Sequence, residues 1–183
     1  MPRLKVHEVV QNRKNHAADC SVCSVHDICL PGLLEAEELK DFSVILRRSE
    51  ILQKGDYLYR EGTRFTDLFA VFSGFFKAAH VDRHGNEQIT AFYFLGEIMG
   101  LHALNAGAYQ YDVVALSSSV ACRIPYENYQ RLAARLPALD EQLHHIFSRE
   151  LIKARFAAAR LTAVQKVATL LIRNGIPVAD DER

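Results

Sequence analysis

The sequence has no excess of either charge, because 22 Lys and Arg residues balance 22 Asp and Glu residues. Surfaces that bind nucleic acid usually show a basic excess, so we expect most of any DNA-reading surface to be missing from these 183 residues. Long apolar runs are also lacking. Residues 1–16 are polar and mixed in charge, and no later run is long enough to span a bilayer. We therefore expect no secretion signal, no membrane contact and a cytoplasmic location.

The motifs of common enzyme classes are missing too. There is no P-loop, and no Ser–His–Asp arrangement can be assigned with any specificity. A cupin-type metalloenzyme is the main enzyme alternative for a small β-roll. It would normally offer a close His-x-His pair, and the eight histidines contain none. We expect no enzymatic activity.

The middle of the chain has the pattern of an antiparallel β domain. From Arg47 to Pro125, short runs rich in Phe, Tyr, Val and Ile alternate with glycines, which is typical of a barrel or jelly roll. Gly85, in the turn Asp82–Asn86, should supply the positive φ that a hairpin loop often requires. The strands that we expect are Leu68–Ser73, Phe75–Val81, Glu87–Leu95, Tyr111–Leu116 and Ser119–Ile124.

Helical periodicity flanks this β region. Apolar residues at steps of three and four predict a short amphipathic helix over Leu34–Leu46. A second short helix, Tyr126–Arg135, stops before Pro137, which is tolerated in the first turn of a long third helix. A further helical segment is expected over Thr162–Ile172.

The long helix carries apolar residues at the a/d spacing of a coiled-coil seam. They are Phe147, Leu151, Ala154, Ala158 and Leu161. This stripe can pack either on the chain's own barrel or on a second copy. We favour a homodimer interface, because the helix is long for a packing element and the two alanines would let two helix backbones approach closely.

Three of the four cysteines lie within ten residues of an N-terminal loop. The pattern is Cys20-x-x-Cys23, then five residues and Cys29. In a reducing cytosol such thiols are more often metal ligands or redox groups than disulfides. Thiolates favour zinc, copper(I) and iron–sulfur clusters, so the spacing predicts a metal centre that orders the loop.

Three ligands require a fourth, and Cys122 is the one thiol left. On the expected strand it shares a face with Val120 and Ile124, and a cysteine in such a position is by itself more often a small buried hydrophobe than a ligand. Four thiolates can hold either zinc or a [4Fe–4S] cluster. Zinc sites usually take their ligands as two close pairs, unlike this three-plus-one arrangement. His26 is an alternative zinc ligand, although a loop histidine is more often solvated.

Several motifs together resemble the FNR branch of the cyclic-AMP receptor protein superfamily. They are Cys20-Ser21-Val22-Cys23 through Cys29-Leu30-Pro31, Gln53-Lys54-Gly55-Asp56, Ser73-Gly74, Gly85-Asn86-Glu87-Gln88-Ile89-Thr90, Gly96-Glu97-Ile98-Met99-Gly100 and Val120-Ala121-Cys122-Arg123-Ile124-Pro125. The resemblance implies a cytoplasmic homodimer with a cyclic-nucleotide-binding-type β-roll. It also implies that Cys20, Cys23, Cys29 and Cys122 hold an oxygen-labile [4Fe–4S] cluster, whose conversion to [2Fe–2S] weakens the dimer and abolishes DNA binding.

The resemblance implies partners as well. Full-length family members bind DNA through a C-terminal helix-turn-helix domain, and we expect that domain to be absent from this chain. The loop Asp82–Glu87 resembles a family surface that contacts RNA polymerase, although it is equally an ordinary charged hairpin tip. Cyclic-nucleotide sites of the superfamily place an Arg on the cyclic phosphate, and the segment His102–Asp112 contains no Arg or Lys. We expect no cyclic nucleotide to bind.

These inferences predict the following organisation: a cysteine-rich, cluster-binding loop over residues 1–33, a β-roll sensory domain over 34–136, a dimerisation helix with its following helical segment over 137–174, and a tail over 175–183. The function that we expect is that of the oxygen-sensing and dimerisation part of a transcription regulator. The alternative is a zinc-stabilised interaction protein without a sensing role.

Overall fold

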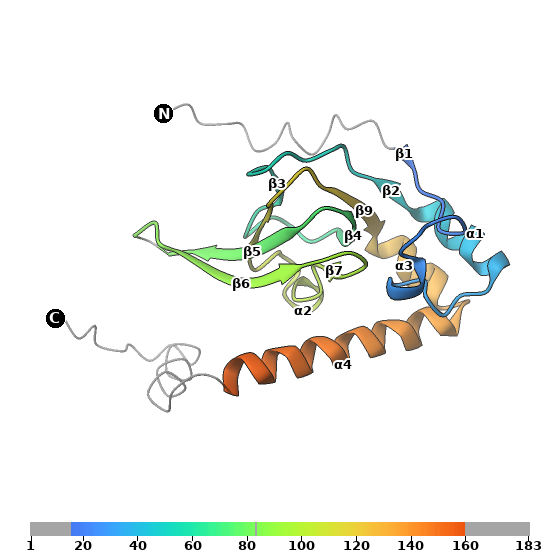
Figure 1. Cartoon of the computed structure of the whole chain (residues 1–183). Coiled ribbons are helices and arrows are strands. Elements are labelled where there is room, and N and C mark those ends of the chain that lie inside the picture. Colours follow the sequence, from blue (N-terminus) through green and yellow to red (C-terminus); the bar gives the residue numbers. More distant parts are fainter. Residues whose placement is uncertain (1–15, 83, 160–183) are drawn as a thin grey trace. The chain divides into compact units, whose positions relative to one another are not determined.

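The computed structural model of the chain describes residues 16–82 and 84–159 (Figure 1). The chain divides into two compact units, one ending at Leu143 and one beginning at His144. All the strands described below belong to the first unit. The helical segment expected over Thr162–Ile172, the seam residue Leu161 and the tail over 175–183 lie outside the described residues.

Two antiparallel sheets form the β-roll. The first has, in spatial order, β1 (His16–Ala17), β2 (Arg47–Arg48), β9 (Val120–Pro125), β4 (Asp67–Ser73) and β7 (Ile98–Met99). The second has β3 (Tyr57–Tyr59), β8 (Asp112–Ala115), β5 (Phe76–Val81) and β6 (Glu87–Tyr93). The expected fold class, an antiparallel cyclic-nucleotide-binding-type roll followed by a long helix, is confirmed.

Strand β4 is buried along most of its length, which explains its nearly continuous apolar sequence. Its core neighbours include Phe76 and Val113, both without exposed surface. The chain reverses between β4 and β5 at Gly74, whose φ is +76°. A Cβ added at Gly74 would also lie 2.1 Å from the Ser119 hydroxyl oxygen. Both the positive φ and this close contact therefore exclude a side chain at this position.

Strands β5 and β6 form the long hairpin coloured green in Figure 1. The expected positive φ at its turn is confirmed, because Gly85 has a φ of +86°. One carboxylate oxygen of Asp82 accepts hydrogen bonds from the backbone N–H groups of His84 and Asn86, at 2.8 and 2.9 Å. The turn is therefore held by its own residues.

The elements that the sequence did not reveal are short. They are β1, β2, β3, β7, the 3₁₀ helix η1 (His26–Ile28) and the helix α2 (Ala103–Ala106). Segments of two to four residues contain too few positions for a periodic pattern. Their position depends on long-range pairing, as when β2 pairs with β9, whose nearest residue is about seventy positions away.

The three predicted helices are α1 (Ala36–Ile45), α3 (Tyr126–Ala133) and α4 (Pro137–Ala159). In α1 the buried residues are Leu39 and Phe42, two of the residues that carried its amphipathic pattern. Reciprocal side-chain and backbone hydrogen bonds between Glu35 and Glu38 cap its N-terminus. Helix α1 lies against α3.

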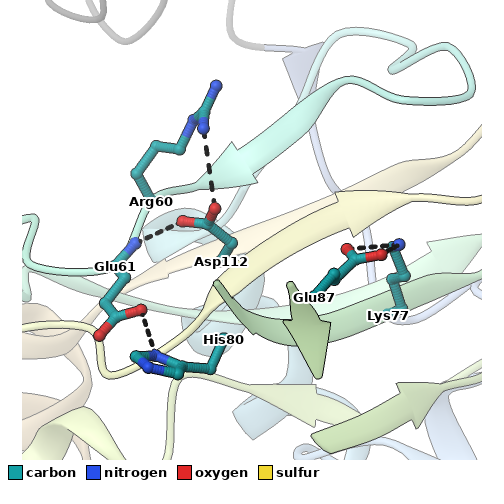
Figure 2. Close-up of polar contacts among 6 residues, drawn as sticks. All are labelled: Arg60, Glu61, Lys77, His80, Glu87 and Asp112. Atoms are coloured by element: carbon teal, nitrogen blue, oxygen red, sulfur yellow. Dashed lines mark hydrogen bonds and ion pairs between the residues drawn. The ribbon is translucent and has the colours of Figure 1, made fainter. Parts of the chain in front are cut away.

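The second sheet and the loop after β3 carry a set of paired charges (Figure 2). Asp112, on β8, accepts a hydrogen bond of 2.8 Å from the Glu61 backbone N–H and lies 3.7 Å from the Arg60 guanidinium. The Glu61 carboxylate in turn lies 2.8 Å from His80. These contacts tie the loop after β3 to β5 and β8.

Candidate metal centre

The four cysteines line a single cavity in the first unit. Cys20 is buried, and Cys23, Cys29 and Cys122 are half-buried. The other lining residues are mostly apolar: Val25, His26, Pro31, Phe42, Leu46, Ala70, Val71, Phe72 and Ile124. The fold thus brings Cys122 to the same cavity as the three cysteines of the N-terminal loop.

The cysteine loop is a series of turns with a period of three residues. Backbone N–H groups donate to carbonyl oxygens three positions earlier, from Cys23 to Cys20 (3.2 Å), His26 to Cys23 (3.3 Å), Cys29 to His26 (3.1 Å) and Gly32 to Cys29 (3.1 Å). This period matches the Cys-x-x-Cys spacing, so the backbone of each loop cysteine takes part in one of these hydrogen bonds. Local backbone geometry therefore positions the three loop cysteines.

Two close contacts fix this loop against the rest of the unit. The backbone N–H of Cys20 donates a hydrogen bond of 2.9 Å to the Ser43 hydroxyl of α1. Gly96, with a φ of +77°, lies under the loop, because a Cβ added there would be 2.7 Å from the Ile28 side chain. The Gly96 turn, which belongs to the motif Gly96–Gly100, thus serves here to admit the cysteine loop.

Gly32 ends the series of turns. A Cβ at this position would lie 2.7 Å from the backbone oxygen of Asp27, a separation that real Cβ atoms essentially never show. Because the obstructing atom belongs to the backbone, the loop itself would have to shift. Gly32 is therefore part of the geometry that presents Cys29.

Cys122 lies in the middle of strand β9, with Ala70 of β4 as its partner on one side and Arg48 of β2 on the other. Cys122 and Ile124 both line the cavity, as expected from the two-residue period of a strand. The guanidinium of Arg48 stacks 3.8 Å from the ring centroid of Phe72, which is another lining residue.

The thiols interact electrostatically with one another. Burial, with smaller contributions from the neighbouring thiols Cys122, Cys20 and Cys23, raises the pKa of Cys29 to about 12. Burial likewise raises the pKa of Cys20 and that of Cys122 to about 11. Arg48 opposes both shifts, by its charge and, at Cys122, also by a hydrogen bond. In the absence of a metal ion, these three thiols are protonated at neutral pH.

The donor set fits a soft metal centre. Within residues 16–82 and 84–159, no three His, Cys, Asp or Glu side chains already form a coordination group, so the four thiols share a cavity without being gathered to ligand distance. His26 lines the same cavity, but its two ring nitrogens contact the Cys23 carbonyl at 3.1 Å and the Asp27 carboxylate at 2.8 Å. Four thiols in a largely apolar cavity suit zinc or an iron–sulfur cluster.

The cysteine loop contacts the first turns of α4. The side-chain amide of Gln142, which is buried, donates a hydrogen bond of 3.1 Å to the Cys29 carbonyl oxygen. The Tyr129 hydroxyl donates one of 3.1 Å to the carbonyl oxygen of Leu139, which has no exposed surface. The start of α4 is thus anchored within the first unit, next to the cavity.

The seam residues expected on α4 are exposed where their side chains are described. Phe147 is 38% exposed and Leu151 57% exposed, and Ala154 is exposed too. The side chain of Ala158 and all of Leu161 lie outside the described residues. Ile152, which the a/d pattern did not include, is 51% exposed.

The interior of the roll near His102–Asp112 is filled by aromatic rings. The rings of Tyr59 and Tyr109 stack with centroids 3.9 Å apart. His102 lies 4.8 Å from the ring centroid of Tyr111 and is half-buried, and this burial lowers its pKa. The expectation that no cyclic nucleotide binds here stays a prediction.

Sequence reasoning missed three residues that contact the cysteines. Ser43 is an ordinary helix serine, and Gln142 is one polar residue among several on α4. Arg48 is indistinguishable in sequence from its neighbour Arg47, whose guanidinium bonds the carbonyls of Val44 and Leu46 instead. No local pattern separates them, because only the strand register decides which arginine faces Cys122.

Comparison with known proteins agrees with this architecture. The cyclic nucleotide-binding domain family matches residues 49–135. The solved structure of the catabolite activator protein of Thermus thermophilus superposes with a TM-score of 0.61 and 24% identity, covering 70% of this chain and 60% of that one. The chain therefore contains a cyclic-nucleotide-binding-type β-roll domain.

Sequence relatives define the family more narrowly. The transcriptional activator protein Anr of Pseudomonas protegens is 33% identical over 168 residues, which is 90% of this chain and 69% of that protein. The transcriptional activator protein FnrA of Stutzerimonas stutzeri is 34% identical over the same shares. This chain belongs to the FNR branch of the cyclic-AMP receptor protein superfamily. None of the helices within residues 16–82 and 84–159 combines the length and the apolar character that a membrane span requires.

Proposed function

We propose that this chain is the oxygen-sensing and dimerisation part of a transcription regulator, with Cys20, Cys23, Cys29 and Cys122 as ligands of a [4Fe–4S] cluster. The observation that carries the proposal is the shared cavity, which joins Cys122 to a loop about a hundred positions earlier in the chain. When bound, the cluster supplies an oxygen-labile centre. The relatives named as the transcriptional activators Anr and FnrA support this assignment.

The chain's own residues connect that centre to the long helix. The turns from Cys20 to Gly32 hold the loop thiols at one wall of the cavity, and β9 holds Cys122 at another. Gln142 bonds the backbone of Cys29, so a rearrangement of the loop would be felt at the beginning of α4. A change of about 1–3 kcal/mol in this coupling is enough to alter dimer occupancy markedly.

Dimerisation is proposed through the apolar side chains that α4 exposes, Phe147 and Leu151 of the seam together with Ile152. Exposed apolar residues at helical spacing lose contact with water when a second helix covers them. In a full-length family member, the dimer would present DNA-reading domains to DNA and a loop such as Asp82–Glu87 to RNA polymerase. Oxygen would weaken that dimer.

The proposal is tested by anaerobic purification followed by visible absorption, analysis of iron, sulfide and zinc, and measurement of mass before and after exposure to air. We expect a brown protein that bleaches in air and a dimer that becomes a monomer. A colourless protein with zinc and no iron would instead establish the zinc-stabilised alternative.

The ligand set is tested by Cys122→Ser, with Val120→Ala as the matched control on the same strand. Cys122→Ser should lose iron and sulfide, and Val120→Ala should keep both. His26→Ala should also keep both, because its ring nitrogens are engaged elsewhere. Retention of the cluster in Cys122→Ser would remove Cys122 from the site.

A further inference from the structure

The cavity that the four cysteines line contains no arginine or lysine among its described lining residues. Four thiolate ligands carry more negative charge than a divalent metal ion neutralises, and a largely apolar cavity does little to screen the excess. A centre bound at this position would therefore be stabilised by a fixed positive charge close to the cavity.

Arg48 lies in that position. It is the partner of Cys122 in the antiparallel pairing of β2 with β9, so its backbone is held next to the ligand by the strand register. Its guanidinium stacks on the ring of Phe72, which itself lines the cavity. Two independent contacts thus hold the charge of Arg48 beside the cysteines.

The contacts described around Arg48 do not neutralise its charge, so this charge can act on the cysteines. The Arg48 Nε is buried and finds no hydrogen-bond acceptor in the part of the chain that the structure describes. Asp19 is a nearby carboxylate, but one of its oxygens already accepts two hydrogen bonds from Ser21, at 2.6 and 2.9 Å. Arg123, the next residue after Cys122, forms an ion pair of 2.8 Å with the buried Asp67.

We propose that Arg48 is a positioning residue of this centre, whose guanidinium compensates the charge of the thiolate ligands at Cys122 and holds strand β2 to the cluster. This inference rests on the proposed function, because it takes the four cysteines as ligands. In agreement with this role, the positive charge of Arg48 opposes the rise in the pKa of Cys20 and of Cys122, and so favours their thiolate forms. Arg48 contacts one proposed ligand, Cys122, and the lining residue Phe72, and it is not itself a ligand.

Two substitutions separate charge from shape. Arg48→Met keeps an unbranched side chain and removes the charge, whereas Arg48→Lys keeps the charge and loses the planar fork. Arg47→Met is the matched control, because Arg47 is exposed and its guanidinium bonds the Val44 and Leu46 carbonyls, away from the cysteines.

The first measurement is a titration of the metal-free full chain with Co²⁺. Binding is monitored by the absorption bands of the Co²⁺–thiolate bonds. Arg48→Met should bind Co²⁺ roughly tenfold to a hundredfold more weakly than the unsubstituted chain, the usual effect of losing a residue that supports a ligand. Arg48→Lys should recover most of the affinity, and Arg47→Met should stay within about twofold of the unsubstituted chain.

The second measurement is the reduction potential of the iron-loaded chain, which a purely structural role would not move. Removing a cation disfavours the added electron, so the potential should fall in Arg48→Met and return towards the original value in Arg48→Lys.

Equal Co²⁺ affinities and potentials in Arg48→Met, Arg47→Met and the unsubstituted chain would overturn the role of Arg48 and leave the proposed function intact. An unsubstituted chain that binds Co²⁺ but never iron would contradict the proposed function, and the Co²⁺ series would still decide on Arg48. A chain that binds neither overturns both.

Discussion

Gln142 and Cys29 lie 113 positions apart, and the side-chain amide of Gln142 donates a hydrogen bond of 3.1 Å to the backbone carbonyl oxygen of Cys29. This contact joins the cysteine loop directly to the first turns of α4. The same carbonyl accepts the Gly32 N–H, so it would keep one partner without Gln142. The contact is therefore a link between two elements more than a stability requirement of either.

Gln142→Leu should remove this link at small cost. We expect a loss of about 1 kcal/mol in the free energy of unfolding, the contribution of one hydrogen bond, with iron and sulfide content unchanged. The mass difference between anaerobic and air-exposed protein should shrink. Glu141→Leu, at the exposed neighbouring position, is the control and should respond to air normally. A full response to air in Gln142→Leu would show that the signal reaches α4 by another route.

Gly32→Ala should disturb the loop itself. The added Cβ would be 2.7 Å from the Asp27 backbone oxygen, so the turn that presents Cys29 must move. We expect a loss of about 1–3 kcal/mol of stability and a marked fall in bound iron. Ser24→Ala, at an exposed position of the same loop, should change neither. Urea unfolding and iron analysis of both variants test this, and normal iron content in Gly32→Ala would contradict it.

Metal affinity should rise with pH. Burial raises the pKa of Cys29 to about 12 and those of Cys20 and Cys122 to about 11, and a thiol must lose its proton to become a ligand. Between about pH 7 and about pH 8, the apparent Co²⁺ affinity should increase by up to about tenfold for each proton released. Titrations at the two pH values measure this, and a pH-independent affinity would mean that the thiols are not the ligands.

Stability should fall in weak acid because of His102. Burial lowers its pKa from the ordinary value of 6.5, so the unfolded chain binds this proton more readily than the folded chain. The stability is therefore complete above pH 6.5 and is lost as the pH falls from there towards the lowered pKa. Urea unfolding at about pH 8 and about pH 5.5 should show a smaller acid loss in His102→Gln than in His84→Gln, a control at an exposed hairpin position.

The exposed seam of α4 gives a test of dimerisation. Leu151→Gln replaces a side chain that is 57% exposed, so the folded monomer should lose little stability. The anaerobic dimer should be weaker and should dissociate at a higher protein concentration, because the substitution removes apolar area that a partner helix would cover. Analytical ultracentrifugation against Arg155→Gln, an exposed control on the same helix, measures the difference. Equal dimer affinity would exclude Leu151 from the interface.

Much of the fold could be predicted from local patterns. The buried run of β4, the glycine of the β5–β6 turn and the periodicity of the three helices are each encoded within a few residues, because strand and helix periods and the sign of φ are local properties. The spacing of Cys20, Cys23 and Cys29 likewise predicted a metal centre, and it coincides with the period of the turns that the loop adopts.

Local sequence patterns were thus enough to predict the class of fold and to propose three of the ligands. The folded structure was needed to show that Cys122 lines the same cavity, that Arg48 and not Arg47 is its strand partner, and that Gln142 contacts the loop. Each of these depends on strand register or on contacts between distant segments. A register shift of one residue would place Arg47 opposite Cys122 instead of Arg48. No local pattern records the register, because it is fixed by the packing of the whole sheet.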